Sequence, residues 1–313
     1  MYDELAPMNV AQMMDRAVWA YKKSFWKQLA FAAVVGVVFF VAVIIATMFF
    51  AVVMMLGLPG GDSPAGVLLV LLAVYLPLIL LWLGISSAGH IHFTRQALIG
   101  HLVHLPKLKI HVLALRALSA IIAQVLIIFP IAAFLVYIFG SSLVLLENLT
   151  LLGDFNIAGF LLVLIMSLFV VISFLLVENI FALSVTVAMF EGKLFFKSIS
   201  RSWELVRDEF FKIFATRFLW YMAGFGFMMA AQGLLFLLWA LVGIMIGTLH
   251  PAFAILLIPV GIFSAIFPFF ITFAQIPMDG IMRAVIYFNQ RIKKEGLDIE
   301  LKLHMIWQRR AVQ

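Results

Sequence analysis

The chain has 313 residues, of which 65% are hydrophobic and 12% are charged, and its mean hydropathy is +1.17. A single soluble core could not bury that much apolar surface, so the composition excludes a soluble globular domain and indicates a membrane protein. The absence of cysteine excludes disulfide and thiolate chemistry, and the net charge of +6 lies at the edges of apolar runs, which indicates membrane surfaces and not nucleic acid.

Six apolar runs are long enough to cross about 30 Å of hydrocarbon, which takes roughly 20 residues. They predict an all-α, polytopic protein with a six-span membrane domain at 1–281 and a cytoplasmic C-terminal tail at 282–313. Two of the runs are longer than a bilayer requires, so we expect them to tilt, bend or project from it. The six spans are expected near 29–57, 66–92, 113–146, 157–190, 214–248 and 252–281.

The segment before the first span is amphipathic at helical spacing, and its basic residues Lys22, Lys23 and Lys27 lie close to the start of the span. The same pattern recurs at 191–217 and, less regularly, from about Arg95. We therefore predict three amphipathic interfacial helices on the cytoplasmic face, each followed by a pair of spans.

Histidines cluster in the connection after the second span. On one continuous helix, His90, His101 and His104 would share a face, which is a conceivable zinc or nickel arrangement. No acidic residue between Asp62 and Glu147 could complete or orient such a site locally. Interfacial or pH-sensitive histidines are therefore the favoured alternative, and we expect neither a metal nor a cofactor.

The pair Glu178-Asn179 interrupts a long apolar run near the cytoplasmic end of the fourth span. An ionisable group at membrane depth is costly unless it meets a partner or water. Glu178 is either a boundary residue paired with an Arg or Lys of a neighbouring interfacial helix, or a group that couples protons or substrate. Asp279 lies at a similar depth in the sixth span, so the two carboxylates could face each other across the cytoplasmic mouth. Glu178, Asn179 and Asp279 are thus the candidate substrate or coupling residues.

The stretch 191–217 has the strongest amphipathic pattern of the chain. Read as one helix, it carries an apolar stripe opposite a charged face, which is typical of a helix lying at a bilayer surface. An amphipathic helix of a soluble core is the alternative. The stripe comprises Ile199, Trp203, Val206, Phe210 and Ile213, and the basic residues predicted to face lipid headgroups are Lys197, Arg201, Arg207 and Lys212.

A helix is expected to continue from the sixth span to Glu295 and to end at Gly296 as its C′ residue. The following segment 297–305 alternates apolar and polar residues, which is strand periodicity. It either pairs with a partner chain or a second copy, or it is an extended segment that presses its Leu and Ile side chains onto the bundle. The second alternative is favoured because one strand is not stable alone.

The distribution of basic residues predicts the orientation. All 21 Lys and Arg residues fall in the N-terminal segment, the second and fourth connections, and the tail. The segments on the other side of the membrane carry acidic residues and no basic residue. By the positive-inside rule, both termini are cytoplasmic.

Two cytoplasmic stretches carry a recognisable set of residues: Arg201, Ser202 and Trp203 in the first, and Arg291, Glu295, Gly296 and Asp298 in the second. With these residues the chain resembles the membrane domain that is attached to some bacterial glycerophosphoryl diester phosphodiesterases and also occurs alone in related membrane proteins, whereas Asn289 and Gln290 depart from the pattern. The resemblance implies a six-span protein of the bacterial cytoplasmic membrane. It does not imply phosphodiesterase activity, which resides in a separate soluble barrel.

No common catalytic motif occurs in the chain, which argues against an enzyme. The function we expect is to handle a lipid or amphipathic solute, as a transporter-like or export-accessory protein with membrane lipids as partners. One alternative is a scaffold or interaction subunit that docks a cytoplasmic protein, or a second copy, through its tail. A lipid-modifying intramembrane enzyme is the third possibility.

Overall fold

The computed structural model describes residues 6–55, 64–99, 109–150, 157–249, 251–300 and 303. These residues form helices and connecting turns, without a strand among them, and the all-α prediction is confirmed. Six helical segments are long and apolar enough to cross a membrane. The prediction of six helices able to span a membrane is therefore confirmed for the described part of the chain, and their composition makes this a polytopic membrane protein.

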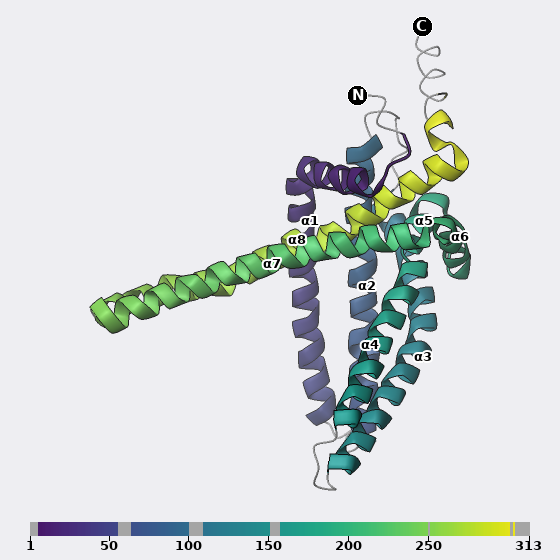
Figure 1. The fold of residues 1–313 in the computed structure, drawn as a ribbon. Coiled ribbons are helices and arrows are strands. Elements are labelled where there is room, and N and C mark those ends of the chain that lie inside the picture. The colour runs from purple at the N-terminus through teal and green to yellow at the C-terminus, as the bar shows by residue number, and fades with distance from the viewer. Residues whose placement is uncertain are drawn as a thin grey trace.

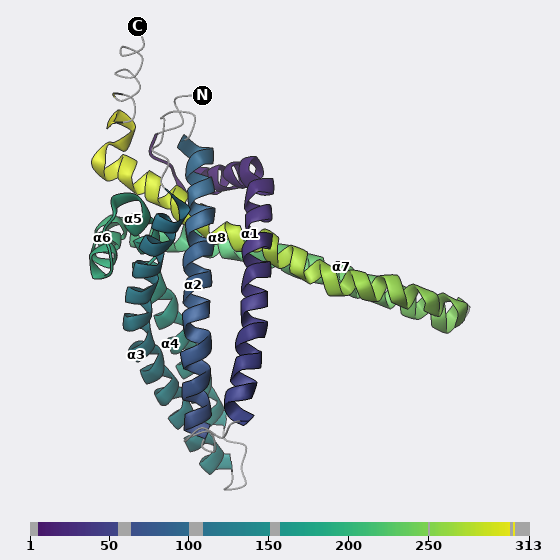
Figure 2. The same cartoon turned by 180° about the vertical axis from the view of Figure 1, so that it is seen from behind.

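The first four long helices run alongside one another (Figure 1). They are α1 (Val10–Met55), α2 (Pro64–Ile99), α3 (Ile110–Thr150) and α4 (Ile157–Ile180). Helix α1 has 46 residues and is roughly 69 Å long at 1.5 Å per residue, which is more than twice the hydrocarbon thickness. Its beginning, which contains the amphipathic N-terminal segment, lies across the long remainder of the helix (Figures 1 and 2).

Two short helices connect this group to a final hairpin. Helix α5 (Ser184–Glu191) follows a turn after α4, and α6 (Phe196–Val206) leads through the 3₁₀ turn η2 (Arg207–Glu209) into α7 (Phe210–Ile244). The π turn η3 (Met245–Leu249) and the 3₁₀ turn η4 (Pro251–Leu256) lie at the tip of the hairpin. Helix α8 (Leu257–Glu295) then returns to the base, without interruption between the predicted sixth span and the predicted tail.

The α7–α8 hairpin projects away from helices α1 to α4 at a large angle (Figures 1 and 2). A flat bilayer that α1 to α4 cross is not crossed by α7 and α8 in this arrangement. All six helices can span the same bilayer only if the α7–α8 hairpin rotates about its base. The six-span topology that hydropathy predicts therefore requires that the junction of α7 and α8 with the rest of the chain allow this rotation.

The tightly packed core lies at the base, where the hairpins meet. Its fully buried side chains include Met13 of α1, Ile213 of α7, and Met282 and Tyr287 of α8. A Cβ atom at Gly36 would overlap the ring of Phe273, so glycine is what allows α1 and α8 to cross closely.

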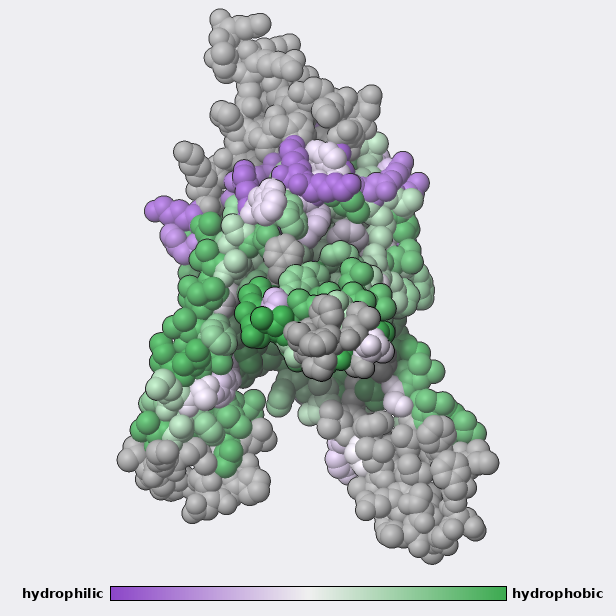
Figure 3. Space-filling view, turned by 90° about the vertical axis from the view of Figure 1, so that its left-hand side faces the viewer, coloured by the Kyte–Doolittle hydropathy of each residue, from purple (hydrophilic) through white to green (hydrophobic). Residues whose placement is uncertain are grey.

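Away from the base, large apolar side chains face outward. Phe40 of α1 is 62% exposed and Phe236 of α7 is 72% exposed, which is compatible only with an apolar surrounding. Figure 3 shows a band of hydrophilic side chains across the upper part of the molecule. Below this band the described surface is mostly hydrophobic and divides into separate arms. The charged base and the apolar arms thus occupy different layers, as a bilayer boundary requires.

Three sequence predictions need correction. The stretch 191–217 is not one helix, because Gly192 has a positive φ of 70°, Phe195 has a φ of 49°, and η2 separates α6 from α7. The predicted lipid-facing stripe is divided, because Val206 and Ile213 are fully buried in the protein core whereas Trp203 is 42% exposed. The buried face of α6 also includes Ser198 and Ser202.

The break between α4 and α5 explains the burial of Ser202. The backbone leaves the helical hydrogen-bond pattern between Ile180 and Leu183, which frees one carbonyl and one N–H group. The Ser202 hydroxyl donates to the Ile180 carbonyl at 2.9 Å and accepts from the Leu183 N–H at 3.2 Å. Because this break lies within the predicted span 157–190, the expectation that the long run bends is confirmed.

The described start of the tail is helical and not extended, which corrects the backbone conformation in both alternatives, although Leu297 packs onto the bundle as the favoured one expects. Gly296 ends α8 with a φ of 63°, as predicted, but 297–300 form a helical turn and not a strand or extended segment. The N–H groups of Ile299 and Glu300 donate to the Gly296 carbonyl, and Leu297 is buried in the core. A short apolar pattern does not distinguish helix from strand, because a helical turn also buries every fourth residue. Positions 301, 302, 304 and 305 lie outside the described residues.

Candidate functional site

Two of the predicted site residues meet the same guanidinium group. Arg217 of α7 is 5% exposed, and its Nη2 lies 2.7 Å from Glu178 Oε1 and 3.9 Å from Asp279 Oδ1. The same Nη2 donates to the Tyr221 hydroxyl at 2.9 Å, and Tyr221 donates to Asp279 Oδ1 at 2.6 Å. Arg283 Nε lies 2.5 Å from Asp279 Oδ2. We call these five residues the Arg217 cluster.

The Arg217 cluster joins α4, α7 and α8 at the point where the α7–α8 hairpin leaves the base. It contains two carboxylates and two guanidinium groups, so its formal charges balance. A buried charge is tolerated when it is paired and hydrogen-bonded in this way. The two carboxylates predicted to lie at the cytoplasmic mouth are therefore linked through Arg217 in the structure.

Asn179, the third predicted site residue, contacts the start of α7. Its side chain is buried and donates to the Phe210 carbonyl at 3.2 Å. This bond ties the end of α4 to the first residue of α7. Asn179 thus positions the two helices that bring Glu178 and Arg217 together, and its amide donates to the backbone of α7 and not to a carboxylate of the cluster.

A groove of about 430 Å³ lies beside the Arg217 cluster, between α7 and α8. Tyr221 and Asp279 belong to both the cluster and the groove wall. Most of the remaining wall is apolar or aromatic, and the polar groups gather toward the cluster. A concave, mostly apolar site with a few convergent polar groups is typical of small-molecule binding. The lining also includes Trp220, Gly224, Phe225, Met228, Thr272, Gln275, Ile276 and Met278.

Gln124, Gln232 and Gln275 interrupt apolar stretches of the long helices, and two of these three glutamines have interhelical partners. Gln124 donates to the Ser184 hydroxyl, and Gln275 Nε2 donates to the Gly224 carbonyl at 2.9 Å. Gln232 is exposed on α7. Hydrogen bonds of this kind hold transmembrane helices together, and the bond of Gln275 also fixes the floor of the groove.

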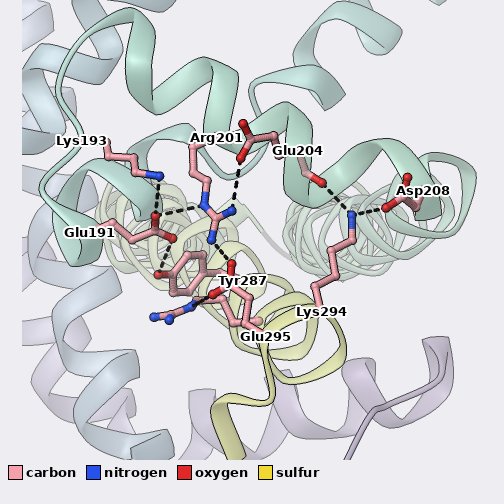
Figure 4. A network of polar contacts seen from close by, with 9 residues as sticks. Glu191, Lys193, Arg201, Glu204, Asp208, Tyr287, Lys294 and Glu295 are labelled. Carbon is pink, nitrogen blue, oxygen red and sulfur yellow. Dashed lines mark hydrogen bonds and ion pairs between the residues drawn. The ribbon is translucent and has the colours of Figure 1, made fainter. Parts of the chain in front are cut away.

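A second polar network holds α5 and α6 against the end of α8 (Figure 4). Arg201 lies at its centre: Nε is 3.1 Å from Glu191 Oε2, Nη1 is 3.2 Å from Glu204 Oε2, and Nη2 contacts Glu295. Tyr287 donates to Glu191 Oε1 at 3.1 Å, and Arg291 Nε is 2.7 Å from Glu295 Oε2.

The Arg201 network connects the two stretches that carry the family resemblance. Arg201 and Ser202 come from the first stretch, and Arg291, Glu295 and Gly296 come from the second. Each of these residues has a structural task, either in an ion pair, in a backbone hydrogen bond or at the helix end. The ring of Trp203 contacts Phe210 at a centroid distance of 6.1 Å. Asp298 lies on the helical turn after Gly296.

The basic residues predicted to face lipid headgroups fall into two groups. Five are exposed: Lys22, Lys23, Lys27, Lys197 and Arg207. Arg201 is occupied by the ion pairs described above, and Lys212 Nζ donates to the Met8 carbonyl at 3.3 Å. Lys23 also lies over the ring of Trp19 at 4.5 Å. The exposed group is the one available to a membrane surface.

The histidines do not assemble a metal site in the described part of the chain, where no group of three potential metal ligands lies together. His90 is 2% exposed, its ring contacts Phe31 edge to face, and both ring nitrogens are buried without a hydrogen-bond partner there. His101 and His104 lie outside the described residues.

Sequence analysis did not single out Arg217, Tyr221 or Arg283. The signal that could have found them is spacing, because Arg217 and Tyr221 lie four residues apart on α7, and Asp279 and Arg283 lie four residues apart on α8. Side chains at that spacing share a helix face. The groove itself could not be found from sequence, since it depends on how α7 packs against α8.

Comparisons with models of protein families, with curated proteins and with solved structures find no significant match for this chain. They therefore give no support to the resemblance to the phosphodiesterase-associated membrane domain, and the function is argued from the site alone.

Proposed function

We propose that this protein binds a lipid or amphipathic solute in the α7–α8 groove and moves it, as a transporter-like or export-accessory protein and not as an enzyme. The observation that carries this proposal is the position of the groove. Its apolar wall begins at the Arg217 cluster, so an amphiphile could place its chain among the aromatic and methionine side chains and its head beside Asp279 and Tyr221. That arrangement separates polar from apolar chemistry along one groove, as an amphiphile requires.

The same proposal places the protein in a bacterial cytoplasmic membrane with both termini in the cytoplasm. The sorting of all Lys and Arg residues to one side supports this orientation. The charged band at the base would then lie among the headgroups of the cytoplasmic leaflet, where exposed basic residues attract anionic lipids.

We also propose that α6 and the beginning of α1 lie at the membrane surface. On α6, Phe196 and Trp203 are exposed on the side away from Ser198 and Ser202, and Phe195 is exposed in the preceding turn. On α1, Trp26 is 76% exposed beside Lys22 and Lys27. Aromatic side chains next to basic ones are favoured at the boundary between headgroups and acyl chains.

The proposal predicts that Glu178→Gln stops transfer of the solute. Glu178 is the carboxylate that pairs with Arg217, and neutralising it changes the charge balance next to the groove. The purified protein would be reconstituted into vesicles with an NBD-labelled monoacylglycerol, whose head is uncharged. The measurement is the rate at which the labelled amphiphile moves between leaflets.

Glu300→Gln is the matched control, because the Glu300 side chain is 72% exposed, follows the end of α8 and is not among the residues that line the groove. We expect the Glu178→Gln rate to fall to that of protein-free vesicles and the Glu300→Gln rate to equal that of the unchanged protein. Gly224→Leu, which fills the groove without altering any charge, should also stop transfer. If all variants and the unchanged protein match protein-free vesicles, transport is excluded and the scaffold alternative is favoured.

A further inference from the structure

The donor groups of the groove already donate hydrogen bonds to the protein. Trp220 Nε1 donates to the Met278 carbonyl at 2.8 Å, and the Tyr221 hydroxyl donates to Asp279 at 2.6 Å. The single N–H or O–H hydrogen of each group is thereby used. Neither side chain has a hydrogen left to offer a ligand.

The other two polar side chains of the wall offer more acceptors than donors, and one N–H bond of Gln275 is the single uncommitted donor among the described lining residues. The Thr272 hydroxyl donates to the Pro268 carbonyl at 2.8 Å, and Gln275 uses one of its two N–H bonds for the Gly224 carbonyl. In the described part of the chain, no hydrogen bond is donated to Thr272 Oγ1 or to Gln275 Oε1. Both oxygens therefore keep their capacity to accept.

Asp279 adds the strongest acceptor of the groove. An ionised carboxylate has about four lone-pair sites. In the structure its two oxygens face the Tyr221 hydroxyl and Arg283 Nε, with Arg217 at 3.9 Å. Lone-pair sites for a further donor therefore remain on this carboxylate, which belongs to the groove wall.

The charge of the groove wall agrees with this hydrogen-bond inventory. Among the described lining residues, Asp279 is the single charged side chain. The guanidinium groups of Arg217 and Arg283 are not part of the lining and are engaged by Glu178, Tyr221 and Asp279. An anionic head in the groove would thus meet a carboxylate and no available cation, which disfavours it.

We propose that the α7–α8 groove prefers an amphiphile whose head donates hydrogen bonds, namely a hydroxyl or ammonium group, over heads that only accept them. The inference rests on the proposed function, because it concerns the substrate class of the same groove. The exposed basic residues at the base attract anionic lipids to the surface, but the groove takes a different class of head. The apolar wall of Phe225, Met228 and Ile276 contacts the chain of the amphiphile.

The test compares photoactivatable analogues that share one C18 chain and differ in the head. Oleyl alcohol and oleylamine analogues donate hydrogen bonds, whereas methyl oleate and oleyl sulfate analogues only accept them. The full chain in detergent micelles is labelled with each, and mass spectrometry locates the label. We expect the two donors to label the segments 220–228 and 272–279. Labelling by the two acceptors should be at least about tenfold weaker, as the loss of a hydrogen bond to a charged group implies.

Gly224→Leu and Gly226→Leu form a matched pair of variants. Gly224 lines the groove, whereas a Cβ atom at Gly226, two residues away on α7, meets nothing within 4 Å. We expect Gly224→Leu to abolish groove labelling and Gly226→Leu to leave it unchanged. Asp279→Asn does not fill the groove, and it should reduce labelling by oleylamine while labelling by oleyl alcohol persists. The alcohol and amine arms thus distinguish a hydroxyl head from an ammonium head.

The outcomes separate the two proposals. Equal labelling by all four heads, or strongest labelling by oleyl sulfate, with a block by Gly224→Leu, would overturn the inferred head preference and leave the proposed function intact. Absence of groove labelling by every analogue would overturn both. Labelling that Gly226→Leu blocks as well as Gly224→Leu would show that the groove is not the binding site.

Discussion

The Arg217→Met substitution tests whether the Arg217 cluster holds the α7–α8 hairpin to the base. The Arg217 side chain is 6% exposed and bonds to Glu178 and Tyr221. Removing it leaves Glu178 without its ion-pair partner in the described part of the chain. Breaking a buried pair by removing one partner costs about 3–5 kcal/mol, because the remaining charge is left uncompensated. We expect the free energy of unfolding to fall by that amount.

The control is Arg207→Met, which removes an arginine from the same connection but from an exposed pair. Arg207 Nε lies 3.4 Å from Asp208 Oδ1, and both side chains are 59% exposed. An exposed pair contributes roughly 0–1 kcal/mol. The assay is equilibrium unfolding in mixed SDS and dodecyl maltoside micelles, followed by circular dichroism.

A double variant identifies the origin of the loss. The double variant Arg217→Met with Glu178→Met removes both charges of the ion pair, so no unpaired carboxylate is left at position 178. Asp279 keeps Arg283 as its partner. We expect the double variant to recover more than half of the stability lost in Arg217→Met, since an apolar pair replaces a buried ion pair at little cost. If Arg217→Met costs no more than Arg207→Met, or the double variant is the least stable of the three, the cluster does not hold the hairpin.

Three further substitutions probe the packing of the base in the same unfolding assay. Gly36→Leu should lower the free energy of unfolding by about 1–3 kcal/mol, because the new side chain overlaps the Phe273 ring. Gly226→Leu is its control, since a side chain there points into open space. Equal effects of the two would show that α1 and α8 do not cross at Gly36. Gly296→Ala should cost about 1–2 kcal/mol, since its φ of 63° disfavours a Cβ atom, and a stabilisation instead would mean that α8 does not end there. His90→Leu should leave stability unchanged or raise it, because it removes two buried ring nitrogens that have no hydrogen-bond partner in the described residues; a loss larger than that of Arg207→Met would contradict this.

Hydropathy predicted the number and approximate location of the membrane-crossing helices, because a bilayer imposes both length and composition on each of them. The end of α8 at Gly296 was also predictable, since a positive φ after the last turn of a helix favours glycine. Both features depend on residues that are close together in the chain, so the sequence alone was enough to predict them.

The break between α4 and α5 and the face that α6 buries could not be predicted in the same way. A hydrophobic pattern counts Ser202 as polar and therefore places it outward. In the structure it is buried because its hydroxyl satisfies two backbone groups freed by the break, which lies about twenty residues earlier. The α6 surface was thus decided by hydrogen bonding to a distant segment and not by its own periodicity.

The site was predicted in part. The pattern singled out Glu178 and Asp279, because ionisable groups within apolar runs are conspicuous. It did not show that one guanidinium group joins them, since Arg217 was grouped with the basic residues of an interfacial helix. The groove arises from the packing of two apolar helices around Gly224, for which the sequence carries no distinct signal.

The central claim is that three helical hairpins cross one bilayer from a basic cytoplasmic base. It is tested most directly by cysteine accessibility, for which this chain needs no prior removal of cysteines. Asp62→Cys lies between α1 and α2 in the sequence, Asp154→Cys between α3 and α4, and Thr248→Cys in η3, which are the three expected hairpin tips, and Lys197→Cys marks the base. With a membrane-impermeant maleimide on intact bacterial cells, we predict labelling at all three tips and labelling of Lys197→Cys only after permeabilisation. Labelling of Lys197→Cys in intact cells, or a protected Thr248→Cys beside two labelled tips, would contradict the account.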